Sequence, residues 1–257
     1  MNKLFLDIGN TRIKRAVISK GNYQYQGAIN VSEFVESDDH ADIFCGFSPD
    51  EVYITSVTSE DNLEMIKSVV QQECGLFPVL LTSQKSTCGL TTGYEDFHKL
   101  GDDRWMAMQG GLGLYEQPFV VISAGTAMTI DAVIEGKHLG GFIVPGLTSL
   151  QSALATDTAG LSISDPETLL ERNSFSAGGL LATNTESGIL GGNLYMTASF
   201  INAIVSDLNE QMQTQFKVIM TGGNAPKLCP LIDFKCECIP DLVLHGMINV
   251  EESVKKS

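Results

Sequence analysis

The sequence predicts an α/β fold made of two related halves, because one strand–turn–strand pattern occurs twice and helical segments alternate with strands. The two copies are LFLDIGNTRIKRAVI, residues 4–18, and VVISAGTAMTIDAVI, residues 120–134. Asp7 and Ser123 hold matching places, 116 residues apart in a chain of 257. We interpret this as an internal duplication with halves at 1–116 and 117–257, the alternative being two unrelated hairpins.

The first half alternates short apolar runs with turn and capping signals. Ser59 is suited to cap a helix, since Glu60 follows it directly and acids favour a first turn, and Gly75 gives a C-terminal stop. The predicted elements, in order, are strands at 3–8, 13–18, 51–57 and 78–81, all buried or half-buried, and helices after Ser59 and from Asp102 or Asp103.

The second half restarts with a buried strand and continues in the same style. Apolar residues recur at helical spacing over a long segment from about Thr185 to Met212, although glycines near its start weaken it unless something packs closely there. The predicted elements are strands at 119–123, 127–134, 140–145 and 217–221, and helices from 147, 185 and 241.

Composition narrows the class of protein. Hydrophobic residues make up 43% and charged residues 18%, as in ordinary globular proteins, and no apolar run reaches the length of a membrane span. The net charge of −15 disfavours nucleic-acid partners, so a phosphate group would need backbone N–H groups or a metal ion to hold it. The six irregularly spaced cysteines are typical of reduced, buried thiols in a cytoplasmic protein and not of a zinc site.

The hairpin Asp7-Ile-Gly-Asn-Thr-Arg-Ile-Lys14 is the first candidate site. Its Gly and Thr allow backbone N–H groups and a hydroxyl to approach phosphate oxygens, Asp7 can orient Mg²⁺ through water, and Lys14 can offset phosphate charge. A plain turn with a solvated lysine is the alternative. Gly-containing tips at residues 123–126 and 221–224 favour a phosphate clamp, and no P-loop motif is present.

Gly101-Asp102-Asp103-Arg104 is the second candidate site. An Asp beside an Arg at a helix start can take a proton from a hydroxyl while the Arg fork holds a carboxylate. A capping Asp with a surface Arg is the alternative that the residues alone leave open.

These residues, in this order, resemble the type III pantothenate kinases, members of the acetate/sugar kinase, Hsp70 and actin superfamily. No single motif decides, but the ordered set covers nearly the whole chain. The matching segments are Asp7-x-Gly-Asn-Thr, Gly89-Leu90 with Tyr94, Gly101-x-Asp103-Arg104, Gly125-Thr126-Ala127, Gly140-Gly-x-Ile-x-Pro-Gly146, Asn184-Thr185-Glu186, Thr221-Gly222-Gly223 and Asp241-Leu-x-Leu-x-Gly246.

The resemblance implies two RNase H-like, actin-like ATPase halves, with mixed sheets flanked by helices and a nucleotide cleft between them. It implies transfer of phosphate from ATP, with Mg²⁺, to pantothenate, the first step of coenzyme A synthesis. Asp103 would accept the hydroxyl proton. The residues implied to bind ATP are Asp7, Ile8, Gly9, Asn10, Thr11, Arg12, Ile13, Lys14 and Thr126, and those implied to bind pantothenate are Tyr94, Gly101, Asp102, Asp103, Arg104 and, near the interface of a homodimer, Thr185.

One position departs from the family. The acid that precedes Ala-Gly-Thr and binds a monovalent cation, K⁺ or NH₄⁺, is Ser123 here, and a neutral hydroxyl is a weaker ligand for a hard cation. Two alternatives to an active pantothenate kinase therefore stay open: an inactive nucleotide-binding accessory protein, and a kinase of the same superfamily that acts on a sugar or short acid.

Overall fold

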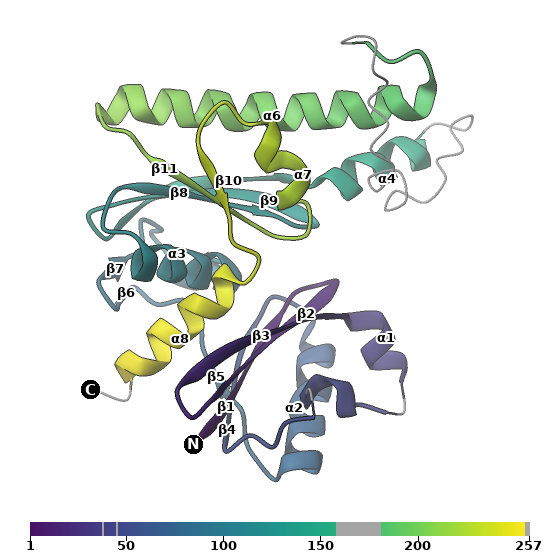
Figure 1. Ribbon diagram of the computed structural model, residues 1–257, viewed down its shortest axis with the longest axis vertical. Helices are drawn as coiled ribbons and strands as arrows, with labels where there is room; N and C mark the ends of the chain where they lie inside the picture. Colours follow the sequence, from purple (N-terminus) through teal and green to yellow (C-terminus); the bar gives the residue numbers. More distant parts are fainter. Residues whose placement is uncertain (38, 45, 158–180, 255–257) are drawn as a thin grey trace. The chain divides into compact units, whose positions relative to one another are not determined.

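The computed structural model describes residues 1–37, 39–44, 46–157 and 181–254 (Figure 1). Its chain forms two mixed sheets flanked by helices, as predicted, and it divides into two compact units. One unit comprises Met1–Gln117, Asp131–Gly140 and Asp241–Ser257, and the other Pro118–Ile130 and Gly141–Pro240. These units group residues by contact and not by duplication, so the boundary between the predicted halves stays a prediction.

Strand order confirms the duplication. One sheet has the order β3-β2-β1-β4-β5, and the other has β12-β11-β8-β9-β10-β7-β6. Numbered within their own half and read from β10 to β12, strands β8 to β12 repeat the first sheet's order of third, second, first, fourth, fifth, while β7 and β6 of the first half extend the sheet beyond β10. The strands are β1 (Asn2–Ile8), β2 (Arg12–Ser19), β3 (Asn22–Asn30), β4 (Glu51–Ser56), β5 (Val79–Leu80), β6 (Ser86–Thr87), β7 (Leu90–Thr91), β8 (Phe119–Ala124), β9 (Ala127–Ile134), β10 (Lys137–Pro145), β11 (Lys217–Thr221) and β12 (Cys236–Cys238).

Registers match as well as orders. β1 pairs in parallel with β4, and Asp7 lies opposite Thr55. In the second sheet β8 pairs in parallel with β11, and Ser123 lies opposite Thr221. Asp7 and Ser123 are therefore equivalent positions of the two copies, as the sequence alignment predicted.

Alternation along β1 decides which way Asp7 points. Leu4, Leu6 and Ile8 are fully buried in a core shared with residues of α1 (Val31–Glu36) and α2 (Glu60–Cys74). Phe5 faces the other side and stacks on Tyr53, with ring centroids 5.1 Å apart. Because successive strand residues alternate between faces, Asp7 lies on the same side as Phe5, away from α1 and α2.

Helices α3 (Asp102–Leu114) and α8 (Leu242–Val254) pack closely within the first unit. A Cβ atom added at Gly110 would overlap the backbone oxygen of Leu242, and one added at Gly246 would overlap that of Met106. Glycine at these two positions therefore sets the helix separation, and it fixes the helix whose first turn carries Asp103.

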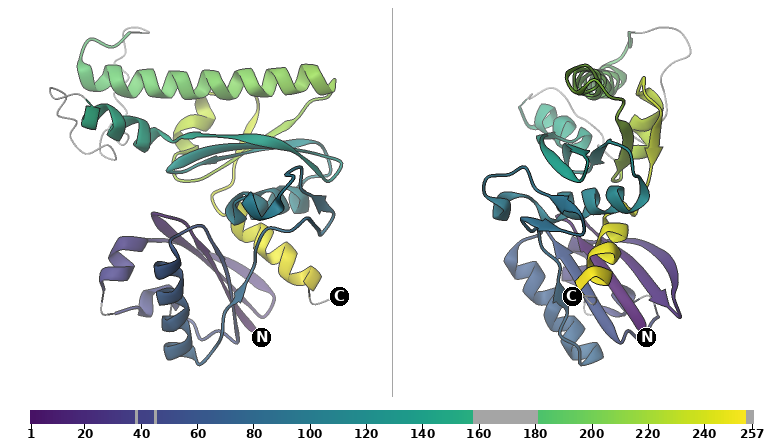
Figure 2. Two further views of the ribbon diagram at one scale, coloured as in Figure 1. Left: turned by 180° about the vertical axis from the view of Figure 1, so that it is seen from behind. Right: turned by 90° about the vertical axis from the view of Figure 1, so that its left-hand side faces the viewer.

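The long helix α6 (Thr185–Met212) lies along the β8–β11 part of the second sheet in both views of Figure 2. It begins at the predicted residue, where the Asn184 side chain accepts a hydrogen bond from the Ser187 backbone N–H at 2.9 Å. Its length and hydropathy would suit a membrane span, which is weak evidence because buried helices pass the same test. The buried leucines Leu190 and Leu194 account for part of that hydropathy.

Two predictions are wrong. The strand predicted at 78–81 is not a buried one: β5 pairs with β4 at the sheet edge, and its two residues, Val79 and Leu80, are 48% and 41% exposed, although Leu81 after it is buried. The described cysteines are free thiols, but none is fully buried and Cys238 is exposed; Cys45 lies outside the described residues. Strand β3 escaped prediction because its polar and aromatic residues give no clear apolar alternation.

Candidate functional site

Asp7 is a buried carboxylate near the end of β1, 6% exposed. Its Oδ2 lies 3.7 Å from Nζ of Lys14, its partner across the β1–β2 hairpin. Burial raises the pKa of Asp7 to about 6, opposed by the Lys14 charge and assisted by the negative charge of Asp103. Two acids from different elements thus lie within electrostatic range of each other, and the Lys14 charge only partly offsets the cost of burying the Asp7 carboxylate.

The tip beyond Asp7 is exposed and tight. The Gly9 N–H donates to the Arg12 carbonyl oxygen at 3.0 Å, which closes the turn. Ile8 and Ile13 point into the core, so only their backbone groups remain for a ligand. The side chains of Asn10, Thr11 and Arg12 are exposed at the tip, between the Asp7 and Lys14 side chains at the two ends of the segment.

The first turn of α3 holds the second acid. Asp103 Oδ1 accepts the Arg104 backbone N–H at 2.8 Å, and burial is the main cause of its raised pKa. A Cβ at Gly101 would lie 2.7 Å from that oxygen, so glycine makes room for the Asp103 side chain. Asp102 instead accepts the Ser83 backbone N–H at 2.6 Å, which ties the preceding loop to the helix start.

Arg104 is not the surface residue of the simpler alternative; it is 4% exposed and fully engaged on one edge. Its Nε and Nη2 donate to the two carboxylate oxygens of Asp131, at 2.9 and 2.6 Å. Its Nη1 donates to the Tyr94 hydroxyl at 2.8 Å. The structure thus brings together Tyr94 and Arg104, both predicted for the substrate site, in one buried network.

Two members of this network had no predicted role. Asp131 lies on β9 and is 1% exposed, and His138 on β10 places Nε2 2.9 Å from Asp131 Oδ1. The Tyr94 ring stacks on the His138 ring, with centroids 5.8 Å apart. An acid inside an otherwise apolar strand, MTIDAVI, is the sequence signal, since a buried carboxylate needs a partner.

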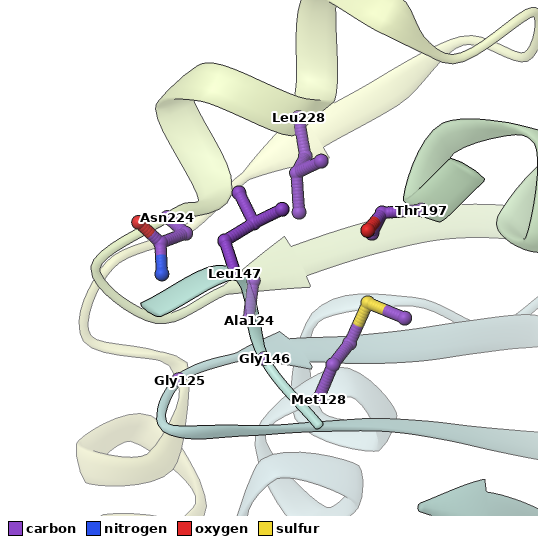
Figure 3. A pocket seen from close by; sticks show the side chains of 8 residues that line it. All are labelled: Ala124, Gly125, Met128, Gly146, Leu147, Thr197, Asn224 and Leu228. Atoms are coloured by element: carbon purple, nitrogen blue, oxygen red, sulfur yellow. The ribbon is translucent and has the colours of Figure 1, made fainter. Parts of the chain in front are cut away.

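The remaining predicted residues lie in the second unit, Ser123 and Thr126 around the turn that follows β8 and Thr185 at the start of α6. A Cβ at Gly146 would overlap the backbone oxygens of Gly125 and Thr126, and one at Gly222 would overlap Ala124. These turns therefore meet with their backbones in close contact. They enclose a small, mostly apolar pocket (Figure 3), lined by Ala124, Gly125, Met128, Gly146, Leu147, Thr197, Asn224 and Leu228.

Ser123 and Thr126 flank this pocket, and Thr185 stands apart at the start of α6. Ser123 is half-buried one residue before the end of β8, and the exposed Thr126 accepts the Gly146 N–H at 2.9 Å through its backbone oxygen. Thr185 is exposed. Among the described residues no cluster of three His, Cys, Asp or Glu side chains could hold a metal ion.

Two solved structures illustrate the similarity of the fold. A putative Baf family transcriptional activator from Campylobacter jejuni aligns with a TM-score of 0.60 and 20% identity, covering 99% of this chain and 100% of that one. MreB 5 of Spiroplasma citri, bound to AMPPNP, aligns with a TM-score of 0.52 and 12% identity, covering 99% and 97%. At these identities the likeness shows the fold alone, an actin-like α/β fold.

Sequence comparison is more specific. The Hydrogenovibrio crunogenus type III pantothenate kinase is 39% identical over 256 residues, covering 98% of this chain and 99% of that protein. The Nitrosococcus oceani type III pantothenate kinase is 32% identical, covering 98% and 95%. A sequence profile of the family, described as type III pantothenate kinase, matches residues 3–207. The chain therefore belongs to the type III pantothenate kinase family.

Proposed function

We propose that this protein transfers the γ-phosphoryl group of ATP to the primary hydroxyl of pantothenate, giving 4′-phosphopantothenate, the first step of coenzyme A synthesis. Two proteins named as type III pantothenate kinases are 39% and 32% identical to this chain over nearly its full length, which supports this reaction. The observation that carries the mechanism is the pair formed by the buried Asp7 and the half-buried Asp103, which lie within electrostatic range of each other. Phosphoryl transfer depends mainly on positioning and charge neutralisation, which such a pair can serve.

Asp103 is the proposed proton acceptor. Burial raises its pKa, which makes its carboxylate a better base, while the Arg104 backbone N–H fixes one of its oxygens. The other oxygen is then oriented to receive the proton as the substrate oxygen attacks phosphorus. Gly101, Asp102, Arg104 and Tyr94 form the rest of the proposed pantothenate site, with the Arg104–Tyr94 end holding the carboxylate.

The hairpin from Asp7 to Lys14 is the proposed phosphate clamp, with Thr126 contributing to the nucleotide site. Backbone N–H groups of the exposed tip bind phosphate oxygens, and Lys14 offsets their charge. Asp7 fits a role beside Mg²⁺, because Lys14 only partly offsets the burial of its carboxylate and Mg²⁺ prefers carboxylate oxygen or water ligands. Bound Mg²⁺ would supply the neutralisation of the phosphates that the reaction requires.

A monovalent cation site is proposed at Ser123, where only hydroxyl-bearing Thr221 lies opposite on the neighbouring strand. A hydroxyl holds K⁺ or NH₄⁺ less strongly than a carboxylate would, so activity should need a higher concentration of that cation.

We further propose a homodimer, with Thr185 near the interface. The exposed stripe of α6 combines two glycines with Tyr195 and Met196, which are 66% and 51% exposed. A Cβ at Gly188 or Gly192 would meet no atom of the described chain within 4 Å, so packing within the chain does not require these glycines. A second copy against this stripe would explain them.

Use of ATP and a net charge of −15 are consistent with a cytoplasmic protein that has no nucleic-acid or membrane partner.

Coupled ADP release with pantothenate tests the proposal. The native protein should turn over, and Asp103→Asn should lower kcat by about 100- to 10,000-fold, as expected for the loss of a general base. Glu73→Gln, an exposed acid on α2, is the matched control and should leave kcat unchanged. Near-full activity of Asp103→Asn would remove Asp103 from its role, and turnover of another acceptor in place of pantothenate would identify a different kinase.

The accessory-protein alternative has less support. The matched relatives are named kinases, and both acids, Asp7 and Asp103, are present in this chain. Absence of turnover at every K⁺ and NH₄⁺ concentration, with nucleotide still bound, would favour that alternative.

A further inference from the structure

The contacts of Arg104 with Asp131 and Tyr94 determine which way its guanidinium points. A guanidinium has five N–H donors, and two of them, on Nε and Nη2, form a bidentate pair with Asp131. A third, on Nη1, binds the Tyr94 hydroxyl. The contacts of the described residues leave two donors, one on Nη1 and one on Nη2, so an anion can approach Arg104 at its Nη1/Nη2 end.

The Asp131 carboxylate also forms a hydrogen bond with His138. A carboxylate only accepts hydrogen bonds, so the His138 Nε2 atom, 2.9 Å from Asp131 Oδ1, carries the proton. His138 is 3% exposed and its Nδ1 has no partner among the described residues, so its one hydrogen bond is directed to Asp131. Tyr94 stacks on the same imidazole, which links both contacts of Arg104 to one ring.

We propose that Asp131 is a positioning residue for pantothenate, supported by His138: it fixes the guanidinium of Arg104 so that a single edge, beside the Tyr94 hydroxyl, meets the substrate carboxylate. This inference rests on the proposed function. A buried ion pair contributes little net stability on its own, whereas a bidentate pair determines direction. The substrate hydroxyl must approach Asp103, the residue before Arg104, so a rotated Arg104 would misplace the reacting oxygen.

A double-mutant cycle tests it with pantothenate and ATP on the full chain. Asp131→Asn should lower kcat/KM for pantothenate by about 10- to 100-fold, the range for one charged hydrogen bond, with KM for ATP unchanged. In an Arg104→Gln background the same change should cost less than about twofold, because Asp131 acts only through Arg104. Additive losses in the two backgrounds would overturn the proposal.

Matched controls separate positioning from stability. Glu251→Gln breaks another buried ion pair of the same unit, Lys3–Glu251 at 2.6 Å, and should lower the melting temperature while leaving kcat/KM unchanged. If the Asp131→Asn variant does not fold, two variants of His138 test the proposal instead. His138→Gln retains an N–H near the Nε2 position and should keep kcat/KM within about threefold, whereas His138→Leu should lose about tenfold.

Equal activity of the two His138 variants would overturn the role of His138 and with it the proposal. Absence of turnover in the native protein would overturn the proposed function, and the inference with it, whereas additive losses in an active enzyme would overturn the inference alone.

Discussion

Replacing Asp7 by Asn should stabilise the ligand-free protein at neutral pH while abolishing most of its activity. The pKa of Asp7 rises from 3.8 to about 6 in the folded state, which corresponds to a cost of about 3 kcal/mol for keeping the carboxylate ionised there. Asn has the same shape and no charge, but it loses the ion pair with Lys14, and burying its amide group also costs free energy. A net gain of about 1–2 kcal/mol remains.

The pH dependence identifies the cause. Below pH 3.8 the carboxyl is protonated in both the folded and the unfolded chain, so Asp7 costs nothing there. The penalty grows as pH rises from 3.8 and is complete above about 6. At pH 5 it is about half its full size, roughly equal to what the Asn side chain loses, so the advantage of the variant should nearly vanish there.

Calorimetric melting at pH 5 and 7.5 measures this difference, at about 2–4 °C for each kcal/mol in a protein of this size. The exposed Glu73→Gln variant, with the same loss of charge, should melt with the native protein at both pH values. A native protein that melts above Asp7→Asn at pH 7.5, or a gap independent of pH, would refute the reasoning.

Three further predictions follow from single residues. Gly93→Ala would drive a Cβ into the backbone oxygen of His138, displacing the neighbouring Tyr94, so KM for pantothenate should rise about tenfold or more in steady-state assays. Gly246→Ala would push α8 off α3 and should cost about 1–3 kcal/mol in denaturant unfolding; a cost near zero would show that the helices separate freely. Ser123→Asp should lower the K⁺ concentration needed for half-maximal activity, and an unchanged K⁺ titration would exclude a cation site there.

The sequence was a good guide to elements whose signals are local. Ser59 caps α2 through the Asn62 N–H, at 3.4 Å, and Gly75 ends it in the left-handed conformation, with φ of 67°. The repeated strand–turn–strand pattern was enough to predict that Asp7 and Ser123 occupy equivalent registers. Such signals need only a few neighbouring residues, so periodicity and capping chemistry reveal them.

Signals that depend on distant partners were missed. Asp131 gains its meaning from Arg104, 27 residues earlier in the chain, and no spacing rule connects them. The prediction that the strand at 78–81 is buried was wrong for the same reason. Whether a strand lies at the edge or in the centre of a sheet depends on the order of the strands and not on the apolar run itself. The roles of the site residues stay predictions, although their chemistry was visible in the motifs.

The close packing of α8 on α3 has a consequence for how the protein is made. The helix that carries Asp103 packs against residues from Asp241 onward, which follow it in the chain by more than a hundred residues. The first unit therefore cannot finish folding when only the first half of this sequence has been made, although N-terminal domains usually fold first. A nascent chain that stops before Leu242 would leave the α3 surface around Gly110 bare, and it would have no phosphotransfer activity until that surface is covered.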